Sequence, residues 1–94
     1  MSDKAIPTLQ IDNDRVCVTE WRFAPGASTG WHVHGHDYVV VPMTTGRLLL
    51  RDQDGERHAD LISGVSYTRA KGVAHDVINA SGGEFVFVEI ELKG

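Results

Sequence analysis

The feature that most constrains this chain is a series of short β-prone segments, separated by glycine-containing turns at nearly even spacing. The predicted strands are 16–23, 31–34, 38–43, 47–51, 56–62, 65–69, 73–79 and 85–92. Residues 1 to about 12 are polar with one proline and are interpreted as a lead-in. No helical period is long enough to predict a helix. The pattern therefore predicts an all-β, antiparallel sandwich or barrel.

Local features add detail to this prediction. Residues 44–46 resemble the turn of a hairpin that joins 38–43 to 47–51. In 85–92, strict alternation places Phe85, Phe87, Glu89 and Glu91 on one face of the strand. The large aromatic side chains are assigned to the core or to a dimer contact: Trp21, Trp31, Phe85 and Phe87.

Length and charge limit the classes of function. Ninety-four residues make one domain, 1–94, and nine Lys and Arg against thirteen Asp and Glu leave no basic surface for nucleic acid. The start lacks the apolar core of a signal peptide, and no apolar run approaches the roughly 18 residues that span a membrane. Cys17 is the single cysteine, which excludes an internal disulfide and is expected to pack as a small apolar residue. We expect a cytoplasmic protein without a membrane partner.

Two histidines one residue apart give the first indication of chemistry. His32 and His34 follow a glycine-bracketed turn and precede a β-branched run, so strand alternation points both toward the same side. Converging neutral imidazoles suit a borderline transition metal, and His75 is the obvious third ligand. His36 shares that face only if the strand continues through Gly35, and a glycine inside a strand often marks a bend. His36 is therefore expected beside the ligands or at the rim.

Two stretches of this chain together resemble a known family. Gly26, His32, His34 and Gly46 match the first motif of the cupins, over residues 26–46. Gly64, Gly72, His75 and Asn79 match the second motif, over residues 64–79. The resemblance implies a single cupin domain, a small double-stranded β-helix of the jelly-roll type with the histidines at the barrel mouth. It also implies a homodimer, and structural roles for Gly72 and Asn79 around His75.

The match departs from the family pattern at two places. Ala70 replaces the proline of the second motif, and the glutamate of the first falls on Val39 or Tyr38. The resemblance thus implies a metal site of three histidines, His32, His34 and His75, without the acidic ligand. Related three-histidine cupins imply Fe(II) first among divalent metals, then Zn, Ni or Mn, and dioxygenase-like chemistry. Some small cupins of this kind are linked to the breakdown of small acids such as β-alanine.

Several side chains have both a functional and a structural interpretation. Tyr38 and Tyr67 could hydrogen-bond a substrate or simply pack in the barrel. Arg69 and Arg47 could clamp a carboxylate or lie in solvent at strand ends. His58 is expected at the surface. The histidine pair itself also fits a barrel without metal.

Three functions follow from these observations. The first is a dioxygenase-like oxidoreductase that acts on a small anionic substrate. The second is a barrel that binds or senses a small ligand without catalysis. The third is an isomerase or lyase in which an unmetallated His32 or His34 is the general base. The sequence assigns no catalytic residue.

Overall fold

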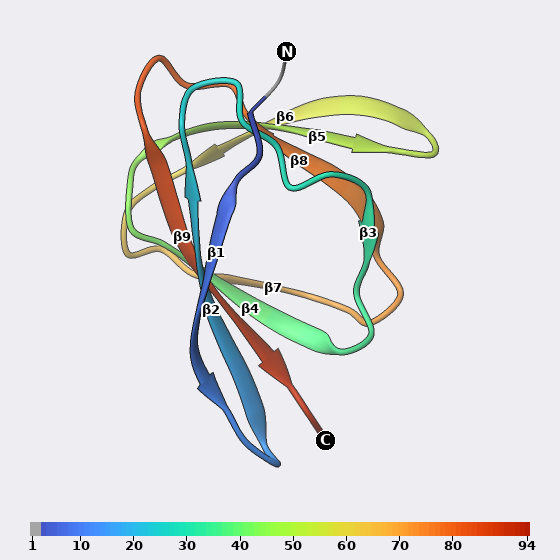
Figure 1. Cartoon of the computed structure of the whole chain (residues 1–94). Helices are drawn as coiled ribbons and strands as arrows, with labels where there is room; N and C mark the ends of the chain where they lie inside the picture. The colour runs from blue at the N-terminus through green and yellow to red at the C-terminus, as the bar shows by residue number, and fades with distance from the viewer. Residues whose placement is uncertain (1–2) are drawn as a thin grey trace.

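The computed structural model describes residues 3–94, which form two antiparallel sheets and no helix (Figure 1). The five-stranded sheet contains, in spatial order, β1 (Ile6–Asp12), β2 (Val16–Phe23), β9 (Phe85–Leu92), β4 (Asp37–Pro42) and β7 (Tyr67–Arg69). The four-stranded sheet contains β3 (His32–Val33), β8 (Ala74–Asn79), β5 (Gly46–Asp52) and β6 (Gly55–Leu61). The predicted all-β antiparallel class is confirmed.

The amino-terminal lead-in is a strand, contrary to the prediction. β1 pairs with β2 along its length, with a register shift between Leu9 and Ile11. All seven of its residues are exposed because β1 is an edge strand that covers no part of the core. Exposure on both faces removes the alternation of apolar and polar residues that would have identified a strand in the sequence.

The predicted hairpin at residues 44–46 is also wrong. β4 pairs with β9 and β7, whereas β5 pairs with β6 and β8, so the segment crosses from one sheet to the other. Gly46 is required by packing rather than by a tight turn. A Cβ atom there would lie 2.8 Å from the Phe85 ring and would collide with Ser81.

The core fills the space between the sheets and is mainly aliphatic and aromatic. Phe23 and Phe85 are fully buried, and Phe23 lies 5.4 Å from Phe87, centroid to centroid. Leu48 and Val77 complete the cluster from the four-stranded sheet. Trp21 packs against this cluster, as predicted, but Trp31 is 55% exposed and lies outside the core.

Candidate metal centre

Strand pairing brings two of the predicted ligands together. His32 of β3 lies directly opposite His75 of β8, although 42 residues separate them in sequence. The His32 ring is fixed by its Nδ1 atom, which donates to the carbonyl oxygen of Gly30 at 2.9 Å. A proton on Nδ1 leaves the lone pair of Nε2 free on the inner side, which is the tautomer that a metal ligand needs.

His34 reaches the same point from just beyond the end of β3. Its backbone N–H donates to Val73 at 2.8 Å, and its carbonyl accepts from Gly72 at 2.8 Å, so the segment is held against the turn before β8. Its ring stacks on Tyr38 with centroids 3.8 Å apart and planes 18° apart. Backbone and ring contacts together therefore fix the direction of the imidazole.

The three Nε2 atoms converge at distances that suit one metal ion. The Nε2 of His34 lies 3.0 Å from that of His32 and 3.2 Å from that of His75. Two nitrogens bound to one ion at about 2.0–2.1 Å, at angles between square and tetrahedral, are roughly 2.9–3.4 Å apart. All three donor atoms lie within 4.8 Å of one another, so His32, His34 and His75 could together hold a divalent transition metal.

Burial keeps the imidazoles of His34 and His75 neutral. The pKa of His34 falls to about 4, chiefly because its ring is desolvated and secondarily because His32 and His75 lie near. The pKa of His75 also falls to about 4, again chiefly through burial. A neutral imidazole is the form that binds metal, so proton competition at these two sites is weak near neutral pH.

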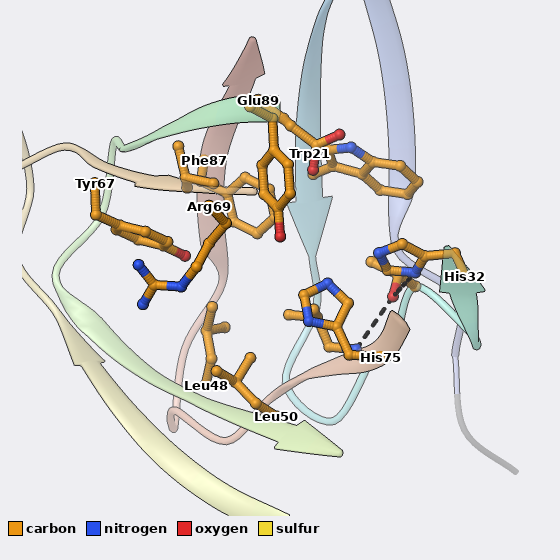
Figure 2. Close-up of a pocket in the computed structure, with 13 residues that line it drawn as sticks. Trp21, His32, Leu48, Leu50, Tyr67, Arg69, His75, Phe87 and Glu89 are labelled. Carbon is orange, nitrogen blue, oxygen red and sulfur yellow. Dashed lines mark hydrogen bonds between the residues drawn. The ribbon is translucent and has the colours of Figure 1, made fainter. Parts of the chain in front are cut away.

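A cavity of about 50 Å³ adjoins the histidines (Figure 2). At roughly 10–15 Å³ for each water molecule it has room for about three to five of them, which is comparable to a small organic molecule. His32 and His75 line it on the side of the four-stranded sheet, and Tyr38, Tyr67, Arg69 and Glu89 line it on the other. The guanidinium of Arg69 lies 4.6 Å from the centre of the Tyr67 ring. Figure 2 shows these two side chains next to each other.

Comparison with known proteins identifies the family. No family model matches the chain. The chain is 63% identical over 90 residues to the Beta-alanine degradation protein BauB of Pseudomonas aeruginosa, covering 96% of this chain and 95% of that protein. It is 64% identical to a cupin domain from Bordetella pertussis Tohama I, with a TM-score of 0.98 and coverage of 100% and 98%.

The chain belongs to the cupin superfamily. A double-stranded β-helix domain from Klebsiella pneumoniae has the same fold at 20% identity, with a TM-score of 0.79 and coverage of 97% of this chain and 78% of that one. The jelly-roll prediction is therefore confirmed. Within residues 3–94 of this cupin, no helix is long and apolar enough to cross a membrane.

The other predicted site residues of the cupin divide into two groups. Tyr38, Tyr67 and Arg69 line the cavity beside the histidines. His36 does not line it, since β3 ends at Val33, and this side chain borders a separate surface hollow. Arg47 is exposed and forms a salt bridge with Asp60 at 2.7 Å. His58 is exposed, as predicted, and Cys17 is half-buried.

Asn79 of this cupin is structural, but its contacts lie elsewhere than expected. Its side-chain amide donates to the carbonyl oxygens of Phe23, Ala24 and Gly83 at 2.8–3.3 Å, and its oxygen accepts from Ser81. These bonds hold β8 to the end of β2 and to the loop before β9, and none of them orients His75.

Two polar residues of the cavity were not predicted as site residues. Glu89 of β9 is only 9% exposed, and Trp21 of β2 has a buried indole N–H. Burial, with a smaller effect of Glu91, raises the pKa of Glu89 to about 7. The sequence did contain a signal, because alternation places Glu89 on the same face as the core residues Phe85 and Phe87.

Proposed function

We propose that this cupin is a metal-dependent oxidoreductase that uses His32, His34 and His75 to hold a divalent metal, with Fe(II) as the first candidate. The observation that carries the proposal is the convergence of three Nε2 atoms, 3.0 and 3.2 Å apart, at the wall of a cavity. A site with three protein ligands keeps positions open for reactants, as catalytic sites require.

The substrate is a small carboxylate. Three neutral imidazoles leave a divalent ion its full +2 charge, which favours an anionic ligand. Arg69 adds a guanidinium at the cavity, and within residues 3–94 it forms no salt bridge. The name of the Pseudomonas aeruginosa relative supports a place in the breakdown of β-alanine or of an acid derived from it.

The chain's own residues bind and orient this substrate. The Arg69 guanidinium donates a hydrogen bond to one carboxylate oxygen of the substrate. The guanidinium is itself positioned by the Tyr67 ring and by a 2.8 Å hydrogen bond from Nη1 to the Thr68 carbonyl. Val40, Leu48 and Leu50 exclude water around the aliphatic part of the substrate. When bound, Fe(II) would supply one-electron chemistry toward dioxygen, which protein side chains lack.

Metal content tests the site directly. Wild-type protein purified without a histidine tag and incubated with Fe(II) is expected to hold close to one metal ion per chain by elemental analysis. His34→Ala should lose most of it, because the variant lacks the imidazole whose Nε2 lies within 3.2 Å of the Nε2 atoms of both His32 and His75. The matched control is His58→Ala, at an exposed position on β6, which should retain the metal. Wild-type protein that stays empty with Fe(II), Mn(II), Ni(II) and Zn(II) would contradict the proposal.

Oxygen uptake tests the reaction class. We expect the iron-loaded protein to consume dioxygen with at least one short-chain carboxylate, and we expect His34→Ala to be inactive. Carboxylates that raise the melting temperature without any turnover would instead favour the ligand-binding alternative.

A further inference from the structure

Two buried polar groups of the cavity have no partner within residues 3–94. The Trp21 Nε1–H is fully buried and makes no hydrogen bond. Glu89 as a whole residue is 9% exposed, and its raised pKa comes from burial and from the charge of Glu91, without a contribution from a hydrogen bond. A buried polar group without a partner destabilises the fold, so the unpaired indole N–H and a carboxyl without a hydrogen bond at the same cavity together indicate a ligand site.

The sheet register makes these two groups neighbours. Trp21 lies opposite Phe87, and Glu89 is two residues further along β9, so Trp21 and Glu89 are diagonal neighbours on one face. That face points inward, because Phe87 belongs to the core. Figure 2 shows both side chains at the upper wall of the cavity, above His32 and His75. The paired groups therefore face the candidate metal centre across the cavity.

Their chemistry selects one kind of ligand group. An indole N–H only donates a hydrogen bond, whereas the ionised Glu89 carboxylate, the form that predominates above its pKa of about 7, only accepts one. The group that satisfies both at once must accept from Trp21 and donate to Glu89. An aliphatic hydroxyl does this with one oxygen atom. An ammonium group has no lone pair for Trp21, and a methyl group satisfies neither.

We propose that Trp21 and Glu89 form a hydroxyl-binding subsite, and that the ligand of this cavity is a short-chain hydroxy acid. The placement of the ligand's carboxylate beside Arg69 and the metal rests on the proposed function. Arg69 lies on the same inner face, opposite Tyr38 in the β4–β7 pairing, whereas Glu89 pairs with Val40. The carboxylate end of the ligand therefore lies beside the Tyr38–Arg69 pair, and the hydroxyl end lies beside the Val40–Glu89 pair. The small cavity limits the length of the ligand.

Three acids that differ only in the substituent on carbon 3 test the subsite. Isothermal titration of the metal-loaded protein compares 3-hydroxypropionate, β-alanine and propionate, which end in a hydroxyl, an ammonium and a methyl group. We expect 3-hydroxypropionate to bind at least about 10-fold more tightly than propionate and more tightly than β-alanine. Equal affinities, tightest binding of β-alanine, or no binding of any of the three acids would overturn the proposal.

Three variants test whether Trp21 and Glu89 cause the preference for the hydroxyl. Trp21→Phe keeps an apolar ring and removes the N–H, so it should weaken 3-hydroxypropionate binding about 3- to 10-fold and leave propionate binding unchanged. Glu89→Leu should abolish the preference for the hydroxyl, whereas Glu89→Gln, which still accepts a hydrogen bond, should preserve most of it. An unchanged preference in Trp21→Phe would contradict the subsite.

The metal content of each preparation separates this proposal from the preceding one. A chain that stays without metal after incubation with Fe(II), Mn(II), Ni(II) and Zn(II), but still prefers the hydroxy acid, would contradict the metal-dependent function and support the subsite. A metal-loaded chain that binds all three acids equally would support the metal site and contradict the subsite.

Discussion

Glu89 is a buried acid whose placement should cost stability. Its pKa rises from an ordinary 4.5 to about 7, so between these values the native state binds more protons than the unfolded state. Stability contributed by this group therefore falls as pH rises from about 4.5 to 7, and the penalty is fully present above pH 7. At 1.36 kcal/mol for each pKa unit the penalty is on the order of 3 kcal/mol.

Glu89→Gln should therefore stabilise the protein by about 2–3 kcal/mol at pH 8 and by little at pH 4.5. Urea unfolding of both proteins at the two pH values measures this, and the difference between them isolates Glu89 because the histidines are common to both. Glu84→Gln, at an exposed position paired with Arg22, is the control and should change stability by less than about 1 kcal/mol at either pH. An equal gain at both pH values would contradict the burial of an ionisable Glu89.

At the scale of elements, β8 is held to the opposite sheet by one buried side chain. Asn79 is 2% exposed, and its four hydrogen bonds reach β2 and the loop before β9. β8 also carries His75, four residues before Asn79, but these hydrogen bonds do not contact that side chain.

Asn79→Leu should destabilise the fold by about 2–4 kcal/mol, because it leaves three backbone carbonyls and one N–H without their partner. Asn79→Asp has nearly the same shape but places an oxygen against the same three carbonyls, so we expect it to be at least as destabilising near neutral pH. Denaturant unfolding monitored by tryptophan fluorescence measures both variants. Wild-type stability of Asn79→Asp would show that shape, not hydrogen bonding, is the requirement at this position.

At the scale of the whole molecule, the sheet edges differ in their protection. The β6 edge carries Glu56, Arg57, His58 and Asp60, and charged side chains of this kind discourage strand addition. The β1 edge exposes Ile6, Leu9 and Ile11, and its single charged residue is at its end. Pro7 and the register shift between Leu9 and Ile11 limit pairing along β1, but an edge strand with so few charges can still pair with the same strand of a second copy around a twofold axis.

We therefore predict a homodimer that forms through β1, with twice the 10.3 kDa mass of the chain by light scattering. Leu9→Lys should convert it to a monomer. Ile62→Lys is the matched control, because Ile62 is equally exposed, at 60%, but lies outside β1. A monomeric wild-type protein, or a dimer that tolerates Leu9→Lys, would contradict this interface.

The sequence by itself determined the class of fold and most of the candidate metal centre. Alternation and glycine turns are local properties, so they identified eight of the nine strands and the shared direction of His32 and His34. The position of His75 came from its match to the second motif, and the structure pairs it with His32. β1 was missed because an edge strand exposed on both faces has no alternation to detect.

Only the tertiary structure decided which strands pair and what faces the cavity. Residues 44–46 look like a hairpin turn, but the pairing of β4 with β9 depends on packing between segments distant in sequence. Glu89 alternates in phase with the core, yet its neighbour Trp21 is 68 residues away and meets it only through the β2–β9 register. A periodic pattern gives the face on which a side chain lies, whereas its neighbours across the sheet depend on long-range packing.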